Sequence, residues 1–290
     1  MSRGAWWAAG IVAAVVAVAH FAVAAQYDAF RNELYFIVTG RHPAFGYVDQ
    51  PPLVPLLAAL TQLAGINIWL LRLPAVLAAI ALVPLTVFFA QLLGATTRGA
   101  WLAAVAAASA TLVTAMTATL ATSTFEPIAF TALAYLVTYA FVRDEPRAFW
   151  WAGALAGVTF EARYGVLFWA IGLGIGVALT GPRAVFASRD LWTGVLIAAV
   201  LALPNVLWQA ANGFPFLELV HNDNPGNFTG SPVGFTLNQI LSVNFLLAPL
   251  WLAGIIVPFF SARLARFRFL SIGFVVTAVF ILITHGKMYY

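Results

Sequence analysis

Long apolar runs alternate with short polar breaks along the whole chain. A helix of about twenty apolar residues spans the hydrocarbon core of a bilayer, and the runs lack the two-residue alternation of a membrane β-barrel. Nine helices are predicted, at residues 5–25, 69–93, 100–119, 127–142, 149–161, 164–180, 191–211, 243–262 and 269–285. The fifth and sixth are short and separated by EARYG, so they could form one broken pair. The pattern predicts an all-α integral membrane protein with about nine transmembrane helices.

The composition agrees with this class and excludes several others. Hydrophobic residues make up 63% of the 290 residues and charged residues 8%, whereas a soluble domain has about a quarter charged residues. The formal charge of +4 comes from arginines in short loops, so it does not indicate a nucleic-acid partner. Without cysteine the chain has no disulfide and no thiolate chemistry. It also lacks the P-loop and Rossmann glycine motifs, so an activated substrate has to arrive through the membrane.

The N-terminal run allows two interpretations. Arg3, the apolar run and the sequence AVAAQ at residues 22–26 could form a secretory signal with a small-residue cleavage site. The run is also long enough to span the membrane, and it opens with Trp6 and Trp7, a pair typical of a membrane interface. We interpret it as an uncleaved first helix, because so many spans follow.

The distribution of charge predicts an orientation. With a cytoplasmic N-terminus, nine of the fourteen basic residues fall inside, at Arg3, Arg98, Arg143, Arg147, Arg183, Arg189, Arg263, Arg266 and Arg268. The positive-inside rule favours this arrangement. The same alternation of inner and outer loops places seven of the ten acids on the outer side, namely Asp28, Glu33, Asp49, Glu126, Glu161, Glu218 and Asp223. We therefore expect a multi-pass protein of the plasma (inner) membrane with its ionisable chemistry on the outer face.

Two predicted outer loops, at residues 26–68 and 212–242, are long enough to hold structure of their own. The first has an amphipathic segment with apolar residues at helical spacing, at Tyr27, Phe30, Leu34 and Ile37. This segment is predicted to be a helix in the membrane interface. The following HPAFGYVDQPPLVP is predicted to stay non-helical through Pro55, because it contains four prolines.

Four acids lie where lipid-facing helices would not tolerate them, and a carboxylate near the bilayer suggests a functional site. Glu33 is the hardest to explain otherwise, because it lies in a segment rich in cations and aromatic residues. Glu126 could instead be a helix cap, and Asp49 could accept hydrogen bonds within its own turn. Glu161 and Arg163 could simply neutralise each other. Each acid thus has a structural interpretation beside the functional one.

Two further groups carry candidate chemistry. At the C-terminal end of the sequence, HGKMYY places Lys287 and Tyr289 where the last helix leaves the bilayer. There they could be a snorkelling lysine and an aromatic belt, or a cation that meets a phosphate. Glu218 and His221 are three residues apart in the second loop, so they could hold a divalent metal with Asp49 or belong to a solvated surface.

At this point the motifs resemble a known family. The segments NELYF, GYVDQPPLVPLLA, EPIAFTALAYLV, LPNVLWQAANGFPFLELVHN and GKMYY together resemble glycosyltransferase family 39, the C-type membrane glycosyltransferases related to protein mannosyltransferases and lipid A aminoarabinose transferases. The resemblance implies a single transmembrane glycosyltransferase-like domain over residues 1–290, with interfacial helices and the active site in the first outer loop. Relatives continue beyond GKMYY, so the resemblance predicts a chain truncated at its C-terminus.

The resemblance also implies roles for individual residues. The family's acidic pair falls on Asn32 and Glu33, so Asn stands where a base is expected and Glu33 or Glu126 would have to serve. Asp49 and Gln50 match positions that contact the donor or a metal, and Lys287 with Tyr289 matches an element that could meet lipid phosphate. Arg41 and Arg72 are further outer cations available for that phosphate.

Together these features predict an inverting transfer of a sugar from a polyprenyl-phosphate carrier to an acceptor hydroxyl. The acceptor could be a lipid, a glycan or a protein, and no cofactor is required, although a divalent metal could take part. A transporter or lipid flippase is the alternative, with the outer carboxylates and the broken helix pair as its gate. A non-catalytic membrane scaffold is a third possibility, for which Asn32 argues.

Overall fold

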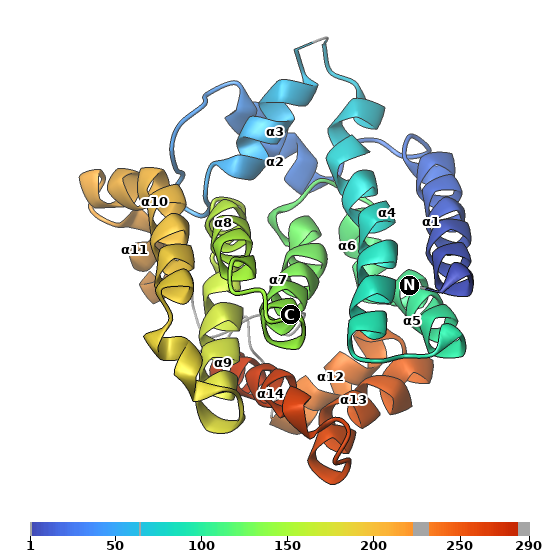
Figure 1. Cartoon of the computed structure of the whole chain (residues 1–290). Helices are drawn as coiled ribbons and strands as arrows, with labels where there is room; N and C mark the ends of the chain where they lie inside the picture. The colour runs from blue at the N-terminus through green and yellow to red at the C-terminus, as the bar shows by residue number, and fades with distance from the viewer. Residues whose placement is uncertain (1, 64, 223–231, 284–290) are drawn as a thin grey trace.

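A computed structural model of the chain describes residues 2–63, 65–222 and 232–283, and over these ranges it is helical without a strand (Figure 1). The α-helices are α1 (Arg3–Val23), α2 (Arg31–Gly40), α3 (Leu53–Thr61), α4 (Ile68–Leu92), α5 (Thr97–Ser109), α6 (Thr111–Thr117), α7 (Glu126–Arg143), α8 (Ala148–Phe160), α9 (Gly165–Thr180), α10 (Arg189–Ala211), α11 (Pro215–Asn222), α12 (Pro232–Val243), α13 (Ala248–Phe260) and α14 (Arg268–Ile283). The predicted all-α class is confirmed over these residues.

Among the described residues, five helical segments are long and apolar enough to cross a membrane, those containing α1, α4, α7, α10 and α14. Two bent pairs raise the number to seven, because α5–α6 turns by 58° and α12–α13 by 100°. Helices α8 and α9 are apolar but have only 13 and 16 residues, which at 1.5 Å per residue is about 20 and 24 Å against a core of about 30 Å. Every predicted apolar run thus contains a helix, but a count of nine spans is not confirmed.

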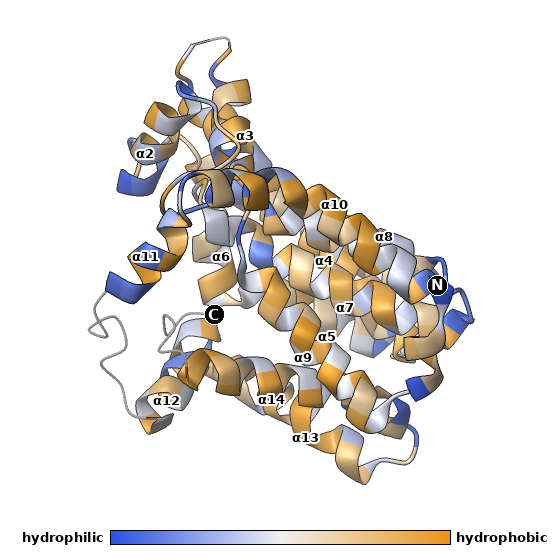
Figure 2. Ribbon diagram, turned by 90° about the vertical axis from the view of Figure 1, so that its left-hand side faces the viewer, coloured by the Kyte–Doolittle hydropathy of each residue, from blue (hydrophilic) through white to orange (hydrophobic). Residues whose placement is uncertain are grey.

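The helices of the bundle pack against one another, in places through small residues. Helix α9 lies along α14 and α8 along α10, while α1 packs against α4 and α5. A methyl group on Gly153 of α8 would overlap the carbonyl of Gly194 in α10, so these two backbones touch. Close approach at glycine is how helices associate where lipid removes the hydrophobic drive. Figure 2 shows apolar residues along the bundle and hydrophilic residues gathered toward its ends.

The bundle has two chemically different ends. One, called here the arginine end, consists of residues 2–4, 93–98, 143–147, 181–189 and 261–268, and it holds the nine arginines of the short loops. Contacts such as Arg263 Nη2 to the carbonyl of Gly94 (2.9 Å) tie its loops together. The other, called the loop end, consists of residues 24–67, 118–126, 161–165 and 205–216. Helices α2 and α3 cover the loop end at the top of Figure 1.

Two predictions about the first loop need correction. Helix α2 begins at Arg31, so Tyr27 and Phe30 precede it. Helix α3 begins at Leu53 and contains Pro55, which the sequence had predicted to stay outside a helix. The first N–H groups of a helix have no intrahelical acceptor, so a proline in the first turn removes no hydrogen bond.

Candidate functional site

A buried ion pair joins α2 to α4 at the loop end. Arg72 donates from Nε to Glu33 Oε1 (2.8 Å) and from Nη2 to Glu33 Oε2 (2.7 Å), and both side chains are fully buried. The backbone N–H groups of Leu120 and Phe30 donate to the same carboxylate at 3.1 and 2.8 Å. Two bonds at each oxygen use the four lone-pair directions of a carboxylate.

Arg72 is equally saturated. Its Nη1 donates to the carbonyls of Ala24 and Tyr27, and its Nη2 donates to the carbonyl of Asp28 at 3.0 Å as well as to Glu33. The guanidinium also lies 4.2 Å from the centre of the Tyr27 ring. All five N–H groups therefore have acceptors, and the pair fixes residues 24–33 onto the bundle.

The second half of the first loop presents the most accessible carboxylate. Asp49 is exposed, and its Oδ1 accepts a 2.6 Å hydrogen bond from the hydroxyl of Tyr35 in α2. Burial, and then this bond to Asp49, raise the pKa of Tyr35. The turn is closed by the N–H of Tyr47, which donates to the carbonyl of Gln50 at 3.0 Å. Asp49 thus has a fixed position and a second oxygen without a protein donor among the described residues.

This turn is attached to the bundle by neutral groups. The side-chain amides of Asn205 and Gln209 in α10 donate to the carbonyls of Phe45 and Tyr47, each at 3.0 Å. Gly46 lies between them, and a Cβ there would overlap the ring of Trp208 and lie 2.7 Å from Asn205 Nδ2. Glycine is therefore required for this close approach.

The break between α8 and α9 completes the attachment. The N–H of Leu53 donates to the carbonyl of Glu161 at 2.7 Å. Tyr164 donates its hydroxyl proton to Asn205 Oδ1 at 2.8 Å and packs edge-on against Phe216, with ring centres 4.5 Å apart. Burial raises the pKa of Tyr164 to about 12, so this phenol stays protonated and acts as a hydrogen-bond donor.

The structure changes the expected partner of Arg163. The sequence suggested that Arg163 and Glu161 neutralise each other, but Arg163 Nε lies 3.2 Å from Glu126 Oε1. Glu126 is the first residue of α7 and is 5% exposed. Its carboxylate also lies against Gly165, where a Cβ would overlap Oε1. The N-terminal turn of α9 thus approaches Glu126, and the positive end of the helix dipole favours an anion at this place.

Glu161 contacts the backbone of α10 and not Arg163. Its Oε1 accepts from the backbone N–H of Asn205 at 3.4 Å, and its Oε2 is buried with no hydrogen-bond partner among the described residues. Burial raises the pKa of Glu161 to about 7. Asn205 and Gln209 were not among the predicted site residues. The available signal was two amides one helical turn apart in an otherwise apolar helix.

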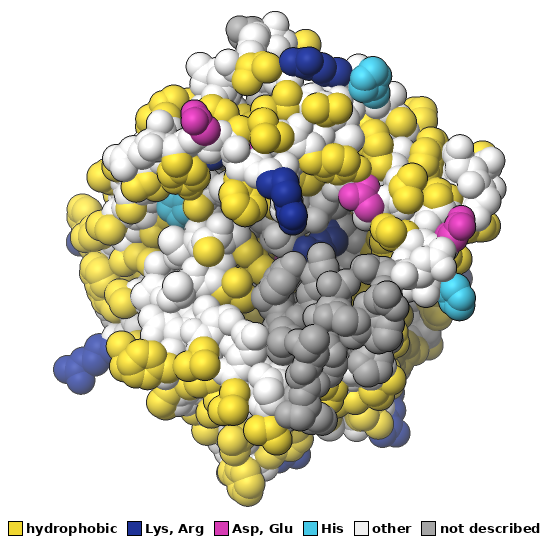
Figure 3. Space-filling model, turned by 180° about the vertical axis from the view of Figure 1, so that it is seen from behind, with side chains coloured by type: hydrophobic (Ala, Val, Ile, Leu, Met, Phe, Trp, Pro, Cys, Tyr) yellow, Lys and Arg dark blue, Asp and Glu magenta, His cyan; other side chains and the backbone are white. Residues whose placement is uncertain are grey.

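The remaining predicted residues are more dispersed. Asn32 and Arg41 are exposed on α2 and at its end, Gln50 is buried in the turn after Asp49, and Glu218 and His221 are exposed on α11. Lys287 and Tyr289 lie outside the described residues. Within the described ranges no three His, Asp or Glu side chains gather as metal ligands. Figure 3 shows the molecule from behind, and the acidic side chains visible in this view all lie in its upper half.

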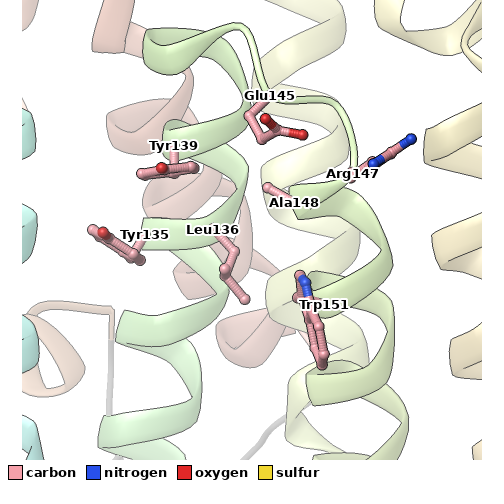
Figure 4. Close-up of a pocket in the computed structure, with 7 residues that line it drawn as sticks. All are labelled: Tyr135, Leu136, Tyr139, Glu145, Arg147, Ala148 and Trp151. Carbon is pink, nitrogen blue, oxygen red and sulfur yellow. The ribbon is translucent and has the colours of Figure 1, made fainter.

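A surface groove of about 410 Å³ lies at the arginine end, between the last turns of α7 and the start of α8. Figure 4 shows Tyr135 and Tyr139 on α7, with Trp151 on α8. None of the predicted site residues lines this groove. The site argued from the sequence and the groove are therefore at opposite ends of the bundle.

Comparisons with known proteins gave one match. The sequence profile of a family described as dolichyl-phosphate-mannose-protein mannosyltransferase matches residues 49–208, slightly more than half of the 290 residues. The match begins at Asp49 and ends at Trp208, so it includes Glu126, Glu161 and Asn205. No curated protein and no solved structure matched the chain.

Proposed function

The chain belongs to the dolichyl-phosphate-mannose-protein mannosyltransferase family, whose members are membrane glycosyltransferases, and on that premise we propose that it takes its sugar from a polyprenyl-phosphate carrier and transfers it to an acceptor hydroxyl. The family membership supports a lipid-phosphate-linked donor. So does the absence from the sequence of P-loop and Rossmann glycine motifs, which leaves the membrane as the route for an activated sugar.

The proposed reaction takes place on the outer face of the plasma (inner) membrane, at the loop end. Nine arginines lie at the opposite end, and the positive-inside rule assigns that end and the N-terminus to the cytoplasm. The exposed apolar side chains of Phe30 and Leu34 on the first loop would contact the outer leaflet, where the polyprenyl chain lies.

One observation carries the proposal: the first loop holds an accessible carboxylate, Asp49, against the bundle at the end where the buried acids Glu33 and Glu126 lie. In the proposed step the acceptor oxygen attacks the anomeric carbon while the bond from that carbon to the phosphate oxygen breaks. The acceptor proton passes to a carboxylate, and attack opposite the leaving group inverts the anomeric centre. The phosphate leaves as a stable anion, so it needs a cation and not a protonating acid.

The geometry favours Asp49 as the base. Its free oxygen is accessible, whereas the four lone-pair directions of Glu33 are occupied by N–H donors. Glu126 is the second candidate, because one oxygen has Arg163 beside it but no hydrogen bond in good geometry. We therefore propose that Glu33 positions the loop, that Asn32 orients the acceptor through its amide, and that Asp49 or Glu126 takes the proton.

The cations of the proposed donor site are Arg41 and Lys287. Arg41 is exposed at the end of α2, so its guanidinium can reach a phosphate in the interface. Lys287, with Tyr289, retains the role that the resemblance implies. Arg72 has no N–H group left for a phosphate, so its proposed contribution is to hold residues 24–33.

The alternative of a transporter or flippase expects ionisable pairs near the middle of the spans. Both ion pairs found within the described ranges, Glu33–Arg72 and Glu126–Arg163, lie at the loop end. This placement supports chemistry at one membrane face over passage through the bundle.

The test uses membranes that contain the full chain and radiolabelled polyprenyl-phosphate mannose or arabinose, with transfer to membrane acceptors measured. We expect transfer from at least one donor, a loss of about 10²-fold or more in kcat for Asp49→Asn if this residue is the base, and unchanged transfer for Glu145→Gln at the arginine end. No transfer from any lipid-linked sugar by the wild-type chain would contradict the proposed function. Loss in Glu126→Gln with full activity in Asp49→Asn would assign the base to Glu126.

A further inference from the structure

Two buried polar atoms at the loop end have no hydrogen bond in good geometry within the described ranges: Gln50 Nε2 and Glu161 Oε2. The Gln50 amide lies near the hydroxyl of Tyr35, which can occupy at most one of its two N–H groups. The two atoms belong to neighbouring segments, because the N–H of Leu53, three residues after Gln50, donates to the carbonyl of Glu161 at 2.7 Å. Gln50 is 5% exposed. Two other atoms share this property, but Glu126 Oε1 faces Arg163, and Trp251 Nε1 lies in α13, away from the loop end.

Such atoms are unusual in a folded protein, because a buried polar group without a partner costs about 1–3 kcal/mol. Both residues are held in place by other hydrogen bonds. The carbonyl of Gln50 accepts from the N–H of Tyr47 at 3.0 Å, and the other carboxylate oxygen of Glu161 accepts from the N–H of Asn205 at 3.4 Å. Each side chain therefore has a fixed position and at least one unused hydrogen-bonding group. Glu33, in contrast, has none unused.

The two unused valences complement each other. The amide nitrogen of Gln50 can only donate, and an ionised Glu161 can only accept, while a hydroxyl group does both. A phosphate is a poor match, because the carboxylates of Glu161 and Asp49 would repel it. A neutral polyol fits both groups.

We propose that Gln50 and Glu161 form a subsite that binds hydroxyl groups of the transferred sugar, separate from the cations that hold the carrier phosphate. The proposal rests on the proposed function and adds to it the residues that recognise the sugar. It makes Glu161, whose sequence context suggested a simple pairing with Arg163, a specificity-determining residue. The backbone link from Leu53 to Glu161 does not involve the side chain, so side-chain substitutions leave that contact in place.

The first measurement needs no catalysis. The purified full chain in lipid nanodiscs is titrated with decaprenyl phosphate, decaprenyl-phosphate mannose and decaprenyl-phosphate arabinose. We expect the wild-type chain to bind at least one glycosylated carrier about tenfold more tightly than bare decaprenyl phosphate, as one or two hydrogen bonds to charged or buried groups would give. Glu161→Gln and Gln50→Leu should lose that preference and keep the affinity for the bare carrier, and Glu145→Gln should keep both.

The outcomes separate the subsite from the proposed function. If the wild-type chain prefers a glycosylated carrier, Glu161→Gln loses the preference and no transfer occurs in membranes, the proposed function fails and the subsite stands. If transfer occurs and Glu161→Gln has the same KM and kcat as the wild type, the subsite is overturned and the function stands. Equal wild-type binding of all three carriers also overturns the subsite, as does a Glu161→Gln chain that no longer binds bare decaprenyl phosphate, because that loss shows a structural role.

Discussion

The two halves of the first loop are attached to the bundle by different chemistry. Residues 24–33 are held by a fully buried, fully hydrogen-bonded ion pair between Glu33 and Arg72. Residues 45–47 are held by neutral amide-to-carbonyl bonds from Asn205 and Gln209, each at 3.0 Å. A buried pair is costly to open, because opening leaves two charges without water, whereas a neutral bond contributes about 1 kcal/mol net. The first attachment therefore contributes more to holding the loop on the bundle than the second does.

The largest effect is expected from breaking the charged attachment. Arg72→Met removes the cation and two of the four donors of the buried Glu33 carboxylate, together with the donors of three carbonyls, so we expect a loss of about 3–5 kcal/mol in the free energy of unfolding. Thermal unfolding in detergent measures it. Arg98→Met, which removes an exposed arginine at the other end, is the matched control. A stability loss no larger than that of the control would show that the ion pair does not hold the loop.

The second effect concerns the contact that brings the neutral attachment together. Gly46→Ala places a methyl group against Trp208 and Asn205, so the turn must move away from α10, at a cost of about 1–3 kcal/mol. We expect transfer activity to fall while the folded chain still accumulates in the membrane, since Asp49 lies on the displaced turn. Gly10→Ala in α1, where an added Cβ meets nothing within 4 Å, should change neither. Normal activity in Gly46→Ala would mean that the turn need not contact α10.

A smaller effect is expected from one neutral bond. Gln209→Leu removes the bond to the carbonyl of Tyr47 and the acceptor for the N–H of Phe216, at a cost of about 1–2 kcal/mol. The matched control is Gln91→Leu, which removes an amide bond to the carbonyl of Ala95 (2.7 Å) at the arginine end. Both should lose similar stability, but only Gln209→Leu should raise the KM for the donor. An equal KM for the donor in the two variants would show that the loop end is no more important for donor binding than the arginine end.

The smallest effect is a dependence of stability on pH. Burial raises the pKa of Glu161 to about 7 from an ordinary value of 4.5, so between these pH values the folded chain binds more protons than the unfolded chain. The contribution of Glu161 to stability is therefore present below about pH 4.5 and is lost as the pH rises toward 7. Unfolding midpoints from pH 4.5 to 8 should fall less steeply in Glu161→Gln than in the wild type or Glu145→Gln. Identical slopes in the three chains would contradict the raised pKa.

The sequence predicted the helices better than the contacts between them. Apolar periodicity located a helix in each of the nine runs, and EARYG correctly indicated the break between α8 and α9. The pairing of Glu33 with Arg72, 39 residues apart, was not visible, because it depends on how α2 docks on α4. The partner of Arg163 was assigned wrongly for the same reason, since the nearest acid in sequence is not the nearest in space. Roles of individual residues in the reaction stay predictions until they are measured.

The contact between Gly153 and Gly194 has a mechanical consequence. Helix α10 carries Gly194 toward the arginine end and Asn205 at the loop end, and the sequence separation of eleven residues corresponds to about 16 Å along the helix. A side chain larger than hydrogen at Gly194 would push α10 away from α8. Because α10 is one continuous helix, the displacement would reach Asn205, to which the turn that bears Asp49 is attached. A residue far from the loop end can in this way change the position of that turn.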